Sequence, residues 1–162
     1  MKISRPSLML WIVAIGLFIS GVTIWPAIPQ LEFIVRTIWG DAPATGEIHA
    51  FTLKVIDGLK HLEDDYAFLL YGYDWLAFAH IALAILFAGA ARDPVRNKWV
   101  IQCGLIMCCL IPILAGICIP LRGIPFWWFF IDFAFAPAAA LSLTIALRDV
   151  CKAELNQSSK LQ

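Results

Sequence analysis

Two ionisable residues, His80 and Asp132, lie inside long apolar runs of the sequence. Each follows a tryptophan by five residues, Trp75 and Trp127 respectively. Indole rings prefer the headgroup level of a bilayer, so both tryptophans mark a membrane interface. At about 1.5 Å per helical residue, the two ionisable side chains would share a depth roughly 7–8 Å below that interface. A charge inside a membrane costs at least about 2.5–3.5 kcal/mol, which makes both residues candidates for a functional site.

Three further side chains could reach the same depth and complete a polar pocket in the outer leaflet. Asp74 precedes the second apolar run, Arg122 lies in a short turn, and Trp128 is one helical turn before Asp132. The candidate ligand-binding residues are therefore Asp132, His80, Asp74, Arg122 and Trp128. A static role is the alternative, in which Asp132 pairs with Arg122 or His80 and only holds two helices in register.

A second polar cluster precedes the second apolar run. Asp57, His61, Asp64 and Asp65 recur at three- and four-residue spacing, which places them on one face of a helix. A histidine with several carboxylates could bind a divalent metal ion. A solvated acidic face produces the same spacing. No cofactor is predicted, because a haem held by two histidines needs a second histidine inside a span and only His80 is there.

The elements that must position these residues are four apolar runs. Hydrophobic residues make up 61% of the 162 residues, above the roughly 45–50% typical of soluble domains. Three runs match the roughly 20 residues that a membrane-spanning helix needs, and the second is at the short limit. The sequence predicts an all-α membrane protein, in one domain, with spans at about residues 8–25, 75–91, 99–119 and 126–147.

The basic residues are distributed unevenly over the connections between these runs. Eight of the twelve Lys and Arg side chains lie near the two termini and in the second connection, and four lie in the first and third connections. Because cytoplasmic loops are enriched in Lys and Arg, both termini are predicted to be cytoplasmic. The membrane is predicted to be the cell membrane, plasma or inner.

The connection at residues 26–74 is the longest, and it carries its own helical pattern. From about residue 45 to 65, apolar residues recur at helix spacing, which predicts an amphipathic helix in the first outer loop. Residues 31–39 form a short apolar stretch that Gly40 and Pro43 end. The other connections are short, which favours an up-down four-helix bundle. Pro112 and Pro137 are expected to kink their helices.

These features predict a protein that binds a lipid-like small molecule or acts as an accessory membrane subunit. The alternative is a membrane-embedded enzyme, a hydrolase or isomerase that uses Asp132 with Asp74 or His80 as acid and base. A structural protein without a pocket is the third hypothesis. The expected partners are the lipid bilayer and either further copies of the chain or another membrane subunit, and no nucleic acid is expected.

Overall fold

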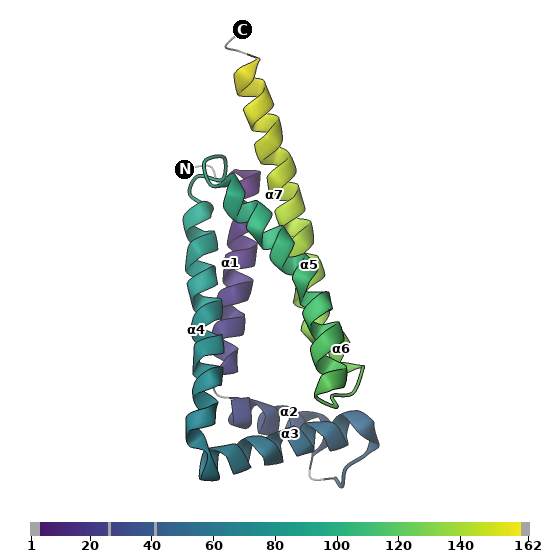
Figure 1. Ribbon diagram of the computed structural model, residues 1–162. Helices are drawn as coiled ribbons and strands as arrows, with labels where there is room; N and C mark the ends of the chain where they lie inside the picture. Colours follow the sequence, from purple (N-terminus) through teal and green to yellow (C-terminus); the bar gives the residue numbers. More distant parts are fainter. Residues whose placement is uncertain (1–3, 26, 41, 160–162) are drawn as a thin grey trace. The chain divides into compact units, whose positions relative to one another are not determined.

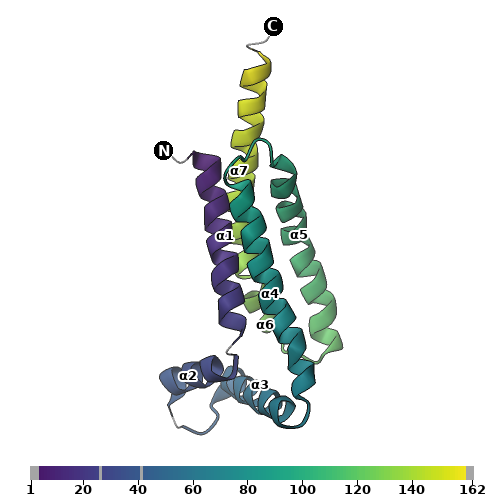
Figure 2. The same cartoon turned by 90° about the vertical axis from the view of Figure 1, so that its left-hand side faces the viewer.

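The computed structural model describes residues 4–25, 27–40 and 42–159, and every regular element in this part of the chain is an α-helix (Figures 1 and 2). The helices are α1 (Arg5–Ile24), α2 (Ala27–Trp39), α3 (Gly46–Asp65), α4 (Ala67–Ala90), α5 (Lys98–Leu121), α6 (Trp128–Phe133) and α7 (Phe135–Ser158).

Four of the helical segments are long and apolar enough to cross a membrane. They are Arg5–Ile24, Ala67–Ala90, Lys98–Leu121 and Trp128–Asn156, the last of which contains α6 and α7. Many of their large apolar side chains are exposed, among them Ile15, Ile19, Leu114 and Phe130. An apolar surface of this kind needs lipid or a partner to cover it. The prediction of four long apolar helices is confirmed, and α4 begins eight residues earlier than the predicted start at residue 75.

The chain divides into two compact units by its internal contacts. The first contains residues up to Gly16 and from Leu83 onward, and the second contains Leu17–Ala82. Each unit contains part of α1 and part of α4. Helices α5 to α7 belong to the first unit, and α2 and α3 belong to the second.

In the first unit, α5 packs along α7. Gly104 makes this packing close, because a Cβ atom at this position would lie 2.7 Å from Leu143 Cδ1 and 2.7 Å from Phe87 Cζ. Ile101, Leu143 and Val150 are fully buried. Small residues at such contacts let membrane helices approach each other closely.

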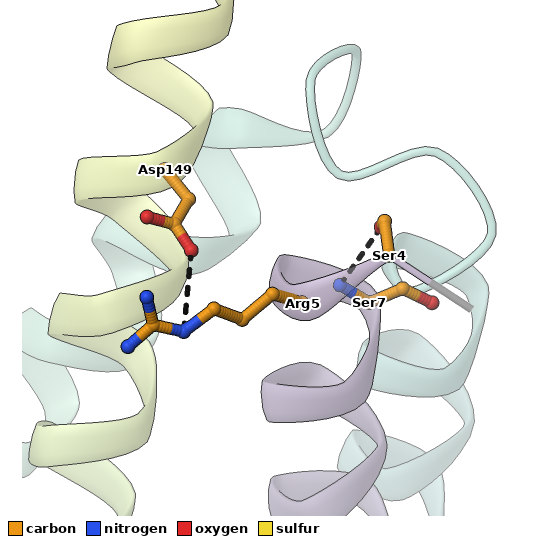
Figure 3. A network of polar contacts seen from close by, with 4 residues as sticks. All are labelled: Ser4, Arg5, Ser7 and Asp149. Carbon is orange, nitrogen blue, oxygen red and sulfur yellow. Dashed lines mark hydrogen bonds and ion pairs between the residues drawn. The ribbon is translucent and has the colours of Figure 1, made fainter. Parts of the chain in front are cut away.

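Polar contacts tie the ends of these helices together in the same unit. Arg5 Nε lies 3.7 Å from Asp149 Oδ2, and this pair sits beside the first turn of α1, where the Ser7 amide donates to Ser4 Oγ (Figure 3). The Ser7 hydroxyl donates to the carbonyl of Ala91 at 2.6 Å. Lys98 Nζ lies 2.6 Å from Glu154 Oε2 and joins the start of α5 to the end of α7.

The fourth apolar segment is interrupted between α6 and α7. The Ala134 amide bonds the Ile131 carbonyl, three residues back, in place of the usual four-residue bond. Pro137 explains the break, because it has no N–H to bond the carbonyl of Phe133 and its ring would clash with that carbonyl. The kink expected at Pro137 is a one-residue irregularity at Ala134, whereas α5 continues through Pro112.

In the second unit, α2 and α3 pack side by side (Figures 1 and 2). Gly40 ends α2 with a φ of 64°, a left-handed conformation that glycine adopts without strain. Val35, Ile56 and Leu59 are buried where the helices meet. The segment with the predicted helical period, residues 45–65, forms α3.

Helices α1 and α4 also approach closely within this unit. A Cβ atom at Gly21 would lie 2.9 Å from the carbonyl oxygen of Ala77 and 2.8 Å from Ile81 Cγ1. Gly21 and Ala77 are both buried. Their small size is what permits the backbones to come this close.

Candidate functional site

The five residues predicted to form one polar pocket belong to different units. Asp74 and His80 lie in the second unit, on α4, and Arg122, Trp128 and Asp132 lie in the first. The geometry around each group can be followed within its own unit.

Asp132 lies in α6, and its carboxylate forms a side-chain hydrogen bond with Trp128, one helical turn earlier. The indole N–H can only donate, so the carboxylate accepts. Arg122 caps the end of α5, where its amide bonds the carbonyl of Cys118. Within the described ranges, no ion pair joins Arg122 and Asp132, which was one of the predicted static pairings.

His80 makes its polar contact within its own helix. Its Nδ1 lies 2.8 Å from the carbonyl oxygen of Leu76, so Nδ1 carries the hydrogen and donates it. A Cβ atom at Gly21 would lie 3.1 Å from His80 Cβ, which puts the base of this side chain at the contact between α1 and α4.

Asp74 lines a cavity of about 400 Å³ in the second unit. Glu63 and Tyr73 line it as well, and its apolar lining is formed by Ile24, Trp25, Ala27, Ile28, Pro29, Leu59 and Leu70. His80 is six residues further along α4, which turns it about 120° around the helix from Asp74 at roughly 100° per residue. The cavity combines two carboxylates and a phenol with an apolar wall.

A second cavity of about 590 Å³ opens between α2 and α3 in the same unit. Glu32, Arg36, His49 and Lys60 line it together with apolar residues. Lys60 Nζ lies 2.5 Å from Glu32 Oε1. The hydrogen bond with Glu32, and then the negative charge of that carboxylate, raise the pKa of Lys60 above its ordinary value of 10.5. The ammonium form is therefore the one present at neutral pH.

His49 is the buried polar side chain of this second cavity. It is 1% exposed and stacks on Trp39, with ring centroids 4.6 Å apart and planes 8° from parallel. Its Nδ1 accepts a hydrogen bond from the Thr45 amide at 3.2 Å. Sequence reasoning did not single out this cavity. The signal available was a tryptophan and a histidine on opposite sides of a Gly-Pro break between two amphipathic segments.

The residues considered for a metal site lie on α3. His61 Nδ1 pairs with Asp65 Oδ2 at 2.9 Å, and both side chains are exposed. In the part of the chain that the structure describes, no group of three or more His, Cys, Asp or Glu side chains is placed to hold a metal ion, and this includes Asp57 and Asp64.

Comparison with known proteins returns no relative. No family model, curated protein or solved structure matches the chain.

Proposed function

We propose that this chain is a multi-pass protein of the cell membrane that binds a lipid-like amphiphile, either alone or as an accessory subunit. In this proposal both termini are cytoplasmic, and the segment with α2 and α3 lies at the outer membrane surface. The excess of Lys and Arg near the termini and in the second connection supports this orientation.

The observation that carries the proposal is the cavity of about 400 Å³ beside Asp74. Its volume lies within the range of small-molecule sites, roughly 300–1,000 Å³. Glu63 and Asp74 give its lining two carboxylates, and the remainder of the lining is largely apolar. An amphiphile whose head group carries an amine or hydroxyl donors fits this division, since the carboxylates accept those donors while the chain contacts the apolar wall.

Asp132 forms a second part of the proposal. A charged residue inside a candidate span is costly and by default has a functional role, which gives Asp132 a part in ligand binding. Its carboxylate also accepts a hydrogen bond from Trp128. In this proposal Arg122 and His80 also contribute to ligand binding.

Lipid analysis of the purified protein tests the cavity. The protein would be extracted with a polymer that keeps surrounding lipid, and its lipids compared with the bulk membrane by mass spectrometry. We expect one amine- or hydroxyl-bearing class to be enriched. Because a hydrogen bond to a charged group contributes about 1.5–3 kcal/mol, Asp74→Asn should reduce this enrichment about tenfold or more.

Asp64→Asn is the matched control, since it removes the same charge from an exposed position outside the cavity. It should leave the enrichment unchanged. Equal loss in both variants, or a lipid composition identical to the bulk membrane, would refute the proposed site.

A further inference from the structure

The cavity between α2 and α3 has the opposite electrostatic character to the one beside Asp74. Arg36 and Lys60 supply two positive charges, and Glu32 supplies one negative charge. The short contact between Lys60 and Glu32 pairs two of the three. Among the described residues, Arg36 takes part in no ion pair, so the cavity has a net positive charge centred on its guanidinium.

His49 also lines this cavity, and its ring can donate one hydrogen bond. The Thr45 amide donates to Nδ1, and a ring nitrogen that accepts carries no hydrogen, so the neutral ring holds its hydrogen on Nε2. Stacking on Trp39 and near-complete burial hold the plane of the ring. Arg36, Lys60 and His49 thus offer donors from both helices and present no competing acceptor of their own.

The groups surrounding the cavity indicate where its ligand comes from. Phe33 lines the cavity and is 70% exposed, and Ile38, further along α2, is 62% exposed. Phe33 and Pro29 also line a neighbouring, mostly apolar cavity of about 340 Å³, together with Gln30 and Ile34. A helix with an exposed apolar face beside a basic site is typical of a segment that lies in the membrane interface.

We propose that Arg36, Lys60 and His49 bind the phosphate of an anionic phospholipid head group, with its acyl chain leaving over Phe33. Arginine offers the planar, bidentate donors that phosphate accepts, and lysine adds a point charge. The volume of about 590 Å³ fits a head group with its glycerol, and it is far larger than the roughly 30 Å³ that one water molecule takes up in the liquid. The phosphate chemistry is shared with free phosphate, but the apolar exit favours the lipid.

Binding of short-chain lipids to the purified full chain in neutral detergent tests this site. Dioctanoyl phosphatidylglycerol, dioctanoyl phosphatidylcholine and inorganic phosphate would be titrated separately by calorimetry. We expect phosphatidylglycerol to bind about tenfold or more tightly than either of the others, the difference that 1.4 kcal/mol provides. Inorganic phosphate binding as tightly as phosphatidylglycerol, or equal binding of the two lipids, would overturn the proposal.

Substitutions at three exposed residues distinguish binding at this site from binding to surface charge in general. Arg36→Gln should weaken phosphatidylglycerol binding about tenfold or more, because a charge-assisted bond contributes about 1.5–3 kcal/mol. Lys54→Gln removes the same charge from an exposed position on α3 that does not line the cavity, and should have no effect. Glu32→Gln should strengthen binding several-fold, because it removes the acid that neutralises Lys60.

The pattern of these variants decides the outcome even if one of them folds poorly. Loss in Arg36→Gln with a gain in Glu32→Gln supports the site, whereas equal affinities in Arg36→Gln and Lys54→Gln overturn it. The site is independent of the amphiphile proposed beside Asp74, because Arg36, Lys60 and His49 do not line that cavity.

Discussion

At the scale of single residues, the charge of Asp132 has to be separated from its hydrogen bond with Trp128. Asparagine has nearly the same shape and keeps an oxygen that accepts from the indole, but it cannot carry the charge. Hydrogen bonds between side chains in membrane proteins average about 0.6 kcal/mol. Replacing Asp132 with asparagine therefore removes the charge but keeps an acceptor for the hydrogen bond from Trp128.

We predict that Asp132→Asn lowers the free energy of unfolding by less than about 1 kcal/mol. We also predict that a gene with this substitution no longer complements a deletion strain. Protein level in the membrane and thermal unfolding in detergent measure the first effect, and complementation measures the second. Trp128→Phe removes the indole donor and keeps the charge, so it should retain most of the function.

A static role for Asp132 predicts a different pattern. In that case Asp132→Asn and Trp128→Phe would lose stability together, and function would fall only with the amount of folded protein. Arg122→Gln would behave alike if Arg122 were the pairing partner. Complementation by Asp132→Asn at normal protein level would contradict a functional role directly.

His80 shows why residue types alone did not settle the predicted pocket. The sequence places one histidine inside an apolar run, and its half-buried imidazole needs a hydrogen-bond partner. Here the partner is the carbonyl of Leu76 in the same helix, and the base of the side chain lies opposite Gly21. A backbone acceptor has no sequence signal, so a pocket ligand and a packing residue have the same pattern.

At the scale of helices, close approach at Gly21 makes a prediction about packing. A Cβ atom there would lie 2.9 Å from the carbonyl oxygen of Ala77, a backbone atom that cannot turn aside as a side chain can. Gly21→Ala should destabilise the protein by about 1–3 kcal/mol, the usual cost of overpacking. Denaturation with sodium dodecyl sulfate in mixed micelles measures the free energy of unfolding.

Gly116→Ala in α5 is the matched control, because nothing lies within 4 Å of a Cβ atom at that position. Replacing this helical glycine should change stability by no more than a gain of about 1 kcal/mol, since alanine restricts the unfolded chain. Similar losses in the two variants would show that the α1–α4 contact at Gly21 is not tight.

Helix positions were predictable from the sequence because length and hydropathy decide them locally. The residues at which the helices begin and end were harder to predict. Helix α4 begins at Ala67, well before Trp75. The aromatic residues between these two positions suggested the membrane interface, but the same stretch contains Leu69 and Leu70 and is part of the helix. The irregularity at Ala134 between α6 and α7 agrees with the kink expected at Pro137, because a proline inside a helix is a recognisable cause of a kink.

At the scale of the whole molecule, the cavities were harder to predict than the helices. Asp74 was named from its place before an apolar run, but the cavity that it lines is completed by Ile24 of α1 and Leu59 of α3. The α2–α3 cavity depends on which faces of two helices meet. The helical period of the sequence predicts which face of a helix is apolar, whereas tertiary packing decides which other helix that face contacts.

Charge placement yields a prediction about the entire chain. Eight of twelve Lys and Arg side chains lie near the termini and in the second connection, while eight of twelve acids lie between Glu32 and Asp74. The basic side of a membrane protein is retained in the cytoplasm. Single cysteines at Ser4, Asp64 and Ser159, in a chain whose native cysteines are replaced, would report the side of each position.

We expect a membrane-impermeant maleimide to label Asp64→Cys in intact cells and to label Ser4→Cys and Ser159→Cys only after permeabilisation. The physical reason is that four spans return the chain to its starting side, so both ends must share one compartment. Labelling of the two ends on opposite sides would mean an odd number of spans. Labelling of both ends in intact cells would reverse the orientation and place the α2–α3 cavity, with its proposed phospholipid, at the cytoplasmic leaflet.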